Sequence, residues 1–342
     1  MSTQRINKLS AVQETDGVPG VSSPAWLQNR LFAVPHHLWH LLIRLLRPRF
    51  SLALLTPVLC GVMLGWWQGA TVHLPTLSLL LAGSAATIVG LNLLHEYHDY
   101  WHARRSNDVR FHQIVFATAY HLMAAEHVTA STVRWLAHGL LFIGLLCYLG
   151  LVSLLGWPLL FFYATSLILI YTYTAPPIRY GYRGWAMGEL GLFLGYGLFP
   201  LVGSYYIIGH TLDWLPVFAG VPFGLIAILL FANYNFVHHR RDWLMRKRTL
   251  VVNFGPRRAM DINSLLTVLV YAGFLCLVSL AYLPMIVLIT LAALPLAVRI
   301  YGQLRAEEVG LIESFQLYRA TVTATLCTAL LFMFALFVNG FF

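Results

Sequence analysis

Long apolar stretches dominate this sequence and constrain its fold more than any other feature. A helix needs roughly 20 apolar residues to cross about 30 Å of hydrocarbon, and nine windows of that size can be marked along the chain. They run approximately over 50–67, 75–94, 133–152, 157–175, 187–208, 215–234, 263–282, 284–301 and 319–340. The windows predict an all-α membrane protein with nine transmembrane helices.

The composition leads to the same class of protein. Of the 342 residues, 59% are hydrophobic and only 10% are charged, whereas soluble domains carry about 25% charged residues. Because this number of charges is too small to cover a water-facing surface, we expect the lipid bilayer to surround the chain. Cytosolic enzymes, secreted disulfide scaffolds and nucleic-acid-binding domains are excluded as classes. The net charge of +9 therefore needs a cause other than nucleic acid.

The distribution of basic residues supplies that cause. If the N-terminus is inside, all 22 Lys and Arg residues fall in cytoplasmic segments or within about a turn of a cytoplasmic helix end, and the opposite loops hold none. The positive-inside rule describes this asymmetry. We expect a multi-pass protein of the cell (inner) membrane with a cytoplasmic N-terminus.

The residues before the first window divide into a polar tail and an amphipathic segment. Residues up to Pro24 lack the apolar core of a cleavable signal. Trp26–Leu46 mixes leucines with basic residues, which predicts an interfacial helix, or an irregular linker because Pro35 interrupts the pattern. We assign 1–45 to a cytoplasmic tail and interfacial helix, and 46–342 to one nine-helix domain.

One polar pattern occurs twice, where the second and sixth windows reach the cytoplasmic side. Asn, His, a further polar residue and Asp occupy offsets that share one helix face. The first copy is Asn92, His95, Glu96 and Asp99, and the second is Asn235, His238, His239 and Asp242. Each copy follows the second window in a group of four. We therefore predict duplicated four-helix units around a central cavity, with a ninth helix added.

These polar faces predict a site for a metal and a diphosphate. Carboxylates meeting at one end of an apolar bundle suit Mg²⁺, which usually bridges a few carboxylates to a substrate phosphate. Arg and Lys bind phosphate oxygens, and a run of them surrounds Asp242: Arg240, Arg241, Arg246, Lys247 and Arg248. For a single residue the alternative is a solvated helix end, but the repeat argues against it for the set. The substrate should carry a hydrocarbon tail that lies among the apolar helices.

The motifs resemble those of the UbiA-type membrane prenyltransferase superfamily, and most closely its 1,4-dihydroxy-2-naphthoate prenyltransferases. Glu96 stands where the first motif usually has Asp, and His238 stands at the first Asp of the second motif. The residues that match are Arg47, Pro48, Asn92, Asp99, Tyr173–Pro177, Tyr182–Gly184, Gly188, Glu189, Asp242, Lys247, Thr249, Leu250 and Gly255. The resemblance covers roughly residues 45–340.

The resemblance implies Mg²⁺-dependent transfer of an isoprenyl chain from its diphosphate to an aromatic acceptor, in a cavity open to lipid. The expected metal ligands are Glu96, Asp99 and Asp242, with Asn92 as a neutral donor. His238 implies that one metal is bound weakly, through imidazole, or not at all. The catalytic set adds Arg183, and the substrate-binding set adds Asn235, His238, Arg241, Lys247, Tyr173 and Glu189.

Aromatic rings should shield an allylic cation by cation–π attraction, and the candidates are Tyr171, Tyr173, Phe193 and Tyr196. Glu189 either orients the acceptor, takes its proton, or pairs with Arg183, and the structural pairing is the favoured interpretation. Chain length, acceptor and oligomeric state depend on cavity shape rather than on these motifs.

Three alternatives remain open at this point. A membrane terpene cyclase would ionise the same diphosphate on the same fold, and the lost acid at His238 favours it. A membrane oxidoreductase would bind a metal through histidines such as His98 and His102. A carrier without chemistry would also be duplicated, but its polar residues should lie near the middle of the membrane.

Overall fold

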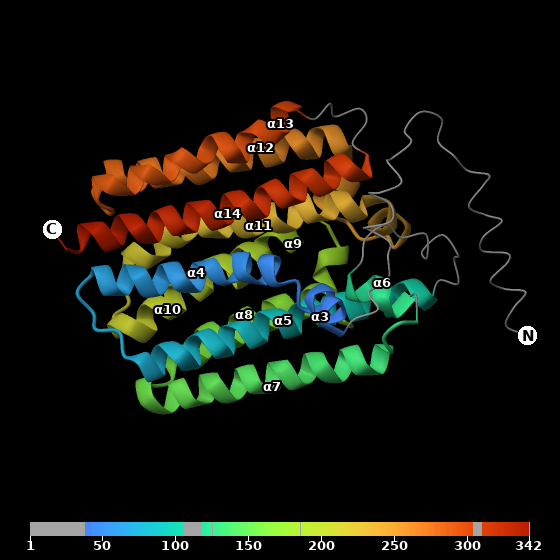
Figure 1. Ribbon diagram of the computed structural model, residues 1–342, viewed down its shortest axis with the longest axis horizontal. Coiled ribbons are helices and arrows are strands. Elements are labelled where there is room, and N and C mark those ends of the chain that lie inside the picture. Colours follow the sequence, from blue (N-terminus) through green and yellow to red (C-terminus); the bar gives the residue numbers. More distant parts are fainter. Residues whose placement is uncertain (1–37, 106–117, 125, 185, 304–309, 342) are drawn as a thin grey trace, which may run out of the picture. The chain divides into compact units, whose positions relative to one another are not determined.

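Figure 1 shows the computed structural model, which describes residues 38–105, 118–124, 126–184, 186–303 and 310–341. Every regular element in these ranges is a helix. In chain order they are α3 (Leu38–Leu46), α4 (Pro48–Trp67), α5 (Leu74–Arg105), α6 (Ala119–Ala124), α7 (Ala130–Leu155), α8 (Pro158–Thr174), η3 (Tyr180–Tyr182), α9 (Met187–Leu192), η4 (Phe193–Leu198), α10 (Phe199–Gly209), α11 (Trp214–Leu244), α12 (Leu250–Ser279), η5 (Met285–Ala293), α13 (Leu294–Gln303) and α14 (Leu311–Asn339).

Seven of the described helical segments are long and apolar enough to cross a membrane. They are Pro48–Trp67, Leu74–Arg105, Ala130–Leu155, Met187–Gly209, Trp214–Leu244, Leu250–Ser279 and Ile312–Asn339. The windows expected at 157–175 and 284–301 coincide with two shorter apolar helices, Pro158–Thr174 and Met285–Arg299. The chain is a multi-pass, all-helical membrane protein, as its composition predicted.

The outer helices carry apolar side chains on their exposed faces. In the span that forms α7 only 11% of the most apolar window is buried, and Trp135, Phe142 and Leu146 are 68%, 59% and 52% exposed. A soluble protein rarely exposes so wide an apolar face. Lipid is therefore the expected surrounding of α7.

Two helices are longer than their apolar windows. The sequence predicted spans that end near residues 94 and 234, but α5 continues to Arg105 and α11 continues to Leu244. The additional turns are polar, and their inward-facing residues are buried with partners inside the protein. Both copies of the polar pattern therefore lie within continuous helices, the first in α5 and the second in α11.

Local sequence signals explain several helix starts. Pro48 begins α4, where a missing N–H costs nothing because the first turn has no acceptor for it. The Thr129 side chain accepts a hydrogen bond from the Thr132 N–H at the start of α7, and Asp213 does the same for Leu215 at the start of α11. Such caps stabilise a helix start by about 1 kcal/mol each.

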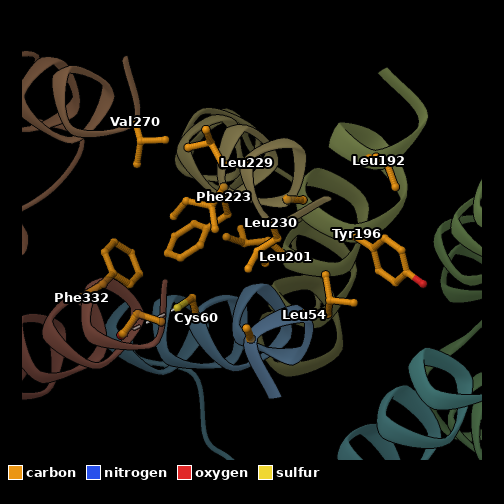
Figure 2. Close-up of a cluster of buried hydrophobic side chains, with 14 of the residues drawn as sticks. Leu54, Cys60, Leu192, Tyr196, Leu201, Phe223, Leu229, Leu230, Val270 and Phe332 are labelled. Atoms are coloured by element: carbon orange, nitrogen blue, oxygen red, sulfur yellow. Dashed lines mark hydrogen bonds between the residues drawn. The ribbon is translucent and has the colours of Figure 1, made fainter. Parts of the chain in front are cut away.

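Aromatic and aliphatic side chains from α4, α10, α11, α12 and α14 form the largest buried cluster (Figure 2). Phe223 contacts both Phe274 and Phe332 edge to face, with ring centroids 5.7 and 5.3 Å apart. Edge-to-face pairs add to the burial term by about 0.5–1.5 kcal/mol. The cluster holds the second half of the chain against α4.

Two pairs of helices touch backbone to backbone. A Cβ on Gly197 in η4 would overlap the backbone of Gly224 in α11, and a Cβ on Gly61 in α4 would overlap Leu201 and Ser204 in α10. Glycine is required at these crossings because its missing side chain lets the helices approach closely. Gly197 lies in a π-helical turn, a local widening that often marks functional sites.

The expected interfacial helix falls only partly within the described residues. The tail to Pro24 and residues 26–37 lie outside them, whereas Leu38–Leu46 forms helix α3. Leu45 of α3 is buried in a cluster with Leu93 and Tyr100 of α5. This contact fixes α3 beside the polar end of α5.

Candidate active site

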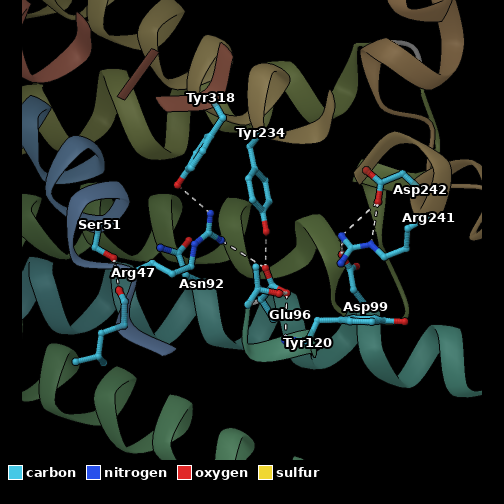
Figure 3. Close-up of polar contacts among 12 residues, drawn as sticks. Arg47, Ser51, Asn92, Glu96, Asp99, Tyr120, Tyr234, Arg241, Asp242 and Tyr318 are labelled. Atoms are coloured by element: carbon cyan, nitrogen blue, oxygen red, sulfur yellow. Dashed lines mark hydrogen bonds and ion pairs between the residues drawn. The ribbon is translucent and has the colours of Figure 1, made fainter. Parts of the chain in front are cut away.

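The two polar faces meet in one small cavity between α5 and α11. Its volume is about 20 Å³, which is close to the room that one water molecule needs. Seven of the residues expected from the sequence line it: Asn92, Glu96, Asp99, Tyr173, Asn235, Arg241 and Lys247. Figure 3 shows the polar contacts around Asn92, Glu96, Asp99 and Arg241. The structure thus brings the first copy together with Asn235 of the second, whereas His238, His239 and Asp242 do not line the cavity.

The Asp99 carboxylate is held by donors from three segments. Lys247 Nζ lies 2.9 Å and Arg241 Nη2 lies 3.3 Å from Asp99 Oδ2, and the Tyr182 hydroxyl donates to Oδ1 at 2.6 Å. Burial, reinforced by the charge of Asp99, raises the pKa of Tyr182 well above its ordinary value. The phenol therefore remains protonated and keeps donating to the carboxylate.

Arg241 connects Asp99 to Asp242 (Figure 3). Its Nη2 is 3.3 Å from Asp99 Oδ2 and also 3.3 Å from Asp242 Oδ1. Asp242 is completely buried and Arg241 is 6% exposed. Within the described residues, Arg241 Nη1 and Asp242 Oδ2 have no hydrogen-bond partner. Asp242 itself does not line the cavity and reaches it through Arg241.

Glu96 accepts four hydrogen bonds. The Tyr234 hydroxyl and Arg47 Nη1 donate to Oε1 at 2.7 and 3.4 Å, while the Thr118 hydroxyl and the Tyr120 N–H donate to Oε2 at 2.8 and 3.3 Å. Several of these donors belong to segments distant in sequence. Glu96 therefore joins α5 to the start of α4, to α11 and to the chain around α6.

Arg47 also belongs to the site, although the motif resemblance assigned it no role. Besides Glu96 it contacts the Tyr318 hydroxyl at 3.2 Å, and its guanidinium lies over the rings of Phe50 and Tyr234 at 4.4 and 4.3 Å. In the sequence, the only local sign that Arg47 belongs to a site is its position before an apolar window, next to Pro48. Tyr182 and Tyr234 were likewise missed as partners of the carboxylates.

His95 and Asn92 of the first repeat contact neighbouring helices inside the protein. His95 Nε2 donates to the Ile170 carbonyl at 2.8 Å, and the Tyr196 hydroxyl donates to Asn92 Oδ1 at 3.4 Å. Tyr196 also lines a neighbouring cavity of about 60 Å³ whose lining is mostly apolar. The polar cavity is thereby adjacent to space that suits a hydrocarbon chain.

Two predicted residues lie elsewhere. Arg183 and Glu189 line a separate, open pocket of about 650 Å³, together with Arg248 and Phe254. The turn between them includes Gly184 at φ 80°, a conformation that glycine adopts freely. Among the described residues, no ion pair joins Arg183 to Glu189. His238 is buried and packs against the Tyr234 ring, with centroids 4.6 Å apart.

Comparison with known proteins identifies the family. The model of the UbiA prenyltransferase family matches residues 54–315. The chain belongs to the UbiA prenyltransferase family. As the motif resemblance indicated, this protein is a membrane prenyltransferase.

Curated proteins similar to this UbiA prenyltransferase include naphthoate prenyltransferases. The 1,4-dihydroxy-2-naphthoate octaprenyltransferase of Escherichia coli is 26% identical over 302 residues, covering 86% of this chain and 94% of that protein. The enzyme of the same name from Mycobacterium tuberculosis is 30% identical over 229 residues, covering 67% and 72%. A UbiA homologue from Archaeoglobus fulgidus, solved with GPP and Mg²⁺, has the same fold, with a TM-score of 0.58, 16% identity and coverage of 88% and 99%.

The donor set of this UbiA prenyltransferase fits one divalent cation at the first repeat. Asn92, Glu96 and Asp99 line the same cavity, and Mg²⁺ prefers oxygen ligands of these kinds together with substrate phosphates. The second repeat differs because its carboxylate, Asp242, is paired with Arg241. Within the described residues, no group of three or more His, Cys, Asp or Glu side chains is placed to hold a metal.

Proposed function

We propose that this UbiA enzyme transfers an isoprenyl chain from a prenyl diphosphate to an aromatic, quinone-precursor-like acceptor. One observation carries the proposal: a cavity lined by Asp99, Arg241 and Lys247 adjoins an apolar cavity through Tyr196. Charged groups beside apolar space fit a substrate with an anionic head and a hydrocarbon tail. The naphthoate prenyltransferases among its relatives support the acceptor class.

The head group would bind where Lys247 and Arg241 now contact Asp99. Both cations donate to the same carboxylate oxygen, Oδ2, so an incoming diphosphate beside Asp99 would meet positive charge from both. Arg241 Nη1 is buried and has no partner among the described residues. A phosphate oxygen would satisfy this donor. Charge-assisted hydrogen bonds of this kind are about twice as strong as neutral ones.

The hydrocarbon tail would lie in the apolar cavity. Leu91, Ile88 and Ile170 line it near the polar cavity, and Leu159 and Ile207 line it further along the helices. Burial of apolar surface contributes about 25 cal/mol per Å². An isoprenyl chain gains most of its affinity in this way, while the diphosphate determines its orientation.

Transfer then proceeds by ionisation and capture. The C–O bond of the prenyl diphosphate breaks and its electron pair leaves with the diphosphate. The acceptor donates an electron pair to the allylic carbon and afterwards loses a proton. Arg241 and Lys247 stabilise the charge on the leaving group. When bound, Mg²⁺ held by Asp99, Glu96 and Asn92 would add Lewis-acid stabilisation of the same oxygens.

Aromatic rings protect the cation before capture. The Tyr173 ring lies under the Lys247 ammonium, 5.6 Å from centroid to Nζ, so its face is already oriented toward positive charge. Tyr196 stacks on Phe231 with centroids 5.3 Å apart, next to Asn92. Such ring faces stabilise a desolvated cation by about 0.5–2 kcal/mol each.

The acceptor would enter from the open pocket at Arg183. Arg183 and Arg248 supply positive charge and Phe254 supplies an apolar surface, which together suit an aromatic carboxylate. Glu189 lines the same pocket and can orient a hydroxyl group or accept its proton. Lys247 lines the diphosphate cavity and Arg248 lines this pocket, so neighbouring residues serve the two substrates.

The site would face the cytoplasm in the cell (inner) membrane. The loops at its opposite end, 68–73, 156–157, 210–213 and 280–284, contain no Lys or Arg, which supports a cytoplasmic N-terminus and a cytoplasmic site. Counting α8 and the η5–α13 segment as spans gives nine helices. The two polar repeats on α5 and α11 support duplicated units, with 1–45 as a separate tail and interfacial helix.

A direct assay tests the function. Full-length protein in lipid nanodiscs would be given GPP or longer prenyl diphosphates, Mg²⁺ and 1,4-dihydroxy-2-naphthoate, and the products would be analysed by mass spectrometry. We expect a prenylated acceptor and stoichiometric diphosphate. A cyclised hydrocarbon that forms without acceptor would instead establish a terpene cyclase. No product from any diphosphate would refute the proposal.

A further inference from the structure

The two copies of the polar pattern differ in charge. The first copy carries two carboxylates, Glu96 and Asp99, whereas the second carries only Asp242 and has histidines at the two middle positions. Directly before Asp242, the second copy has Arg241 where the first has the neutral His98. The exchange therefore has two parts: His239 stands in place of the acid Glu96, and the permanent cation Arg241 stands in place of His98.

Arg241 lies where that exchange matters. Its Nη2 is 3.3 Å from a carboxylate oxygen of each copy, Asp99 Oδ2 and Asp242 Oδ1. Two buried carboxylates repel each other unless a cation lies between them. In a metal site that cation is a divalent ion, but here the guanidinium of Arg241 already fills the position.

The surroundings fix Arg241 in place. Its side chain is 6% exposed, its Nε also donates to Asp242 Oδ1 at 3.4 Å, and its guanidinium lies 4.9 Å from the centroid of the Tyr120 ring. Arginine stays protonated under all ordinary conditions. The cation between the two copies is therefore part of the protein, independent of metal supply.

We infer that Arg241 acts as a built-in cation that replaces a second metal ion, so that the site binds a single divalent cation together with the diphosphate. The cation would be held by the first copy, while Arg241 Nη1 contacts the diphosphate directly. This inference rests on the proposed diphosphate site. It makes Arg241, rather than a metal, the bridge between Asp99 and Asp242.

Metal counting tests the inference without catalysis. Full-length protein would be titrated with Mn²⁺ in the presence of inorganic diphosphate, and free Mn²⁺ would be followed by electron paramagnetic resonance. We expect one bound Mn²⁺ per chain in the unaltered protein, and two in Arg241→Gln, because Asp242 then loses its ion pair while Lys247 stays with Asp99. Two bound ions in the unaltered protein would overturn the inference.

Thermal unfolding provides a second readout. Without diphosphate, the melting temperature of the unaltered protein should not change when EDTA replaces Mg²⁺, whereas Arg241→Gln should melt at lower temperature in EDTA and recover with Mg²⁺. Arg240→Gln is the matched control, because it removes the same charge from an exposed neighbour on α11. Melting of Arg241→Gln that is unaffected by Mg²⁺ would contradict the inference.

Two further variants guard against a folding defect. Arg241→Lys keeps a single positive charge and should retain one bound Mn²⁺ and a metal-independent melting temperature. His238→Asp combined with Arg241→Gln restores an acid to the second copy and should bind the second Mn²⁺ more tightly than Arg241→Gln alone. A second ion bound by Arg241→Lys would count against the proposal. Because the probe is inorganic diphosphate, a failure to transfer prenyl groups would not alter these results.

Discussion

Lys247 Nζ lies 2.9 Å from Asp99 Oδ2, although the two residues are 148 positions apart in sequence. Lys247 follows the end of α11, where its backbone N–H donates to the Asp242 carbonyl at 2.8 Å. The turn that ends α11 therefore aims the ammonium at α5. Asp99 is the residue at which the two halves of the molecule meet.

Asp99→Asn should abolish diphosphate release without unfolding the protein. The change keeps the shape of the side chain but removes the charge that holds Lys247 and Arg241. We expect turnover to fall by at least about 100-fold, the effect of losing one major electrostatic contact. Release of diphosphate from GPP measures the loss.

Asp261→Asn serves as the control for Asp99→Asn, because Asp261 is exposed near the start of α12. It should leave turnover and melting temperature unchanged. Normal turnover in Asp99→Asn would remove this residue from the site.

Tyr182→Phe should weaken turnover moderately. The phenol donates to Asp99 Oδ1 at 2.6 Å, and a hydrogen bond to a charged group contributes about 1.5–3 kcal/mol. We therefore expect kcat/KM to fall roughly tenfold or more, with the melting temperature little changed. Tyr282→Phe, at an exposed position after α12, should have no effect. Equal kinetics in both variants would show that Tyr182 does not position Asp99.

Arg47→Met should destabilise the fold. Arg47 and Glu96 are an almost fully buried pair, and removing one partner of such a pair costs about 3–5 kcal/mol because the other charge stays buried. Thermal unfolding should show the loss. Arg49→Met, two residues along and exposed, should not.

A second change can separate lost charge pairing from lost packing at Arg47. Adding Glu96→Gln to Arg47→Met removes the orphaned carboxylate, so it should restore part of the melting temperature. If the double variant melted below Arg47→Met, the pairing of Arg47 with Glu96 would not explain the effect.

Ser166→Leu should shorten the prenyl chain that the enzyme accepts. Ser166 lines the apolar cavity of about 60 Å³, and a leucine there would occupy much of that space. Competition between short and long prenyl diphosphates, with products resolved by mass spectrometry, gives the preference. Ser153→Leu, on an exposed face of α7, is the control. An unchanged preference would place the tail elsewhere.

Much of this architecture follows from patterns within the sequence. Apolar windows predicted the seven long spans, and the repeated polar face predicted that the two copies would meet in one cavity. Asn92, Glu96 and Asp99 of the first copy and Asn235 of the second line that cavity. Asp242 does not line it and reaches it through Arg241, which lies outside the repeated pattern. Such patterns succeed because helix periodicity determines which side chains share a face. The apolar windows underestimated the lengths of α5 and α11, because hydropathy alone marks a helix as ending where its inward face becomes polar.

No local sequence pattern predicts the contacts between distant segments. Arg47 reaches Glu96 over 49 positions and Tyr234 reaches it over 138, and no local spacing encodes either contact. Arg183 and Glu189 matched motif positions, but the turn around Gly184 places them at a different pocket from Asp99. Their location depends on backbone geometry that a motif does not contain.

The glycine crossings limit how this enzyme can change its substrate range. Gly197 of η4 already touches Gly224 of α11, and Gly61 of α4 already touches Ser204 of α10. The helices of each pair therefore cannot move closer together. Any side chain added at these glycines would force them apart. If the isoprenoid lies in the apolar cavity, trimming bulky rings of its lining such as Phe162 and Phe199 would enlarge the chamber without disturbing these crossings. Variation in chain length should appear at those rings, while the crossings stay glycine.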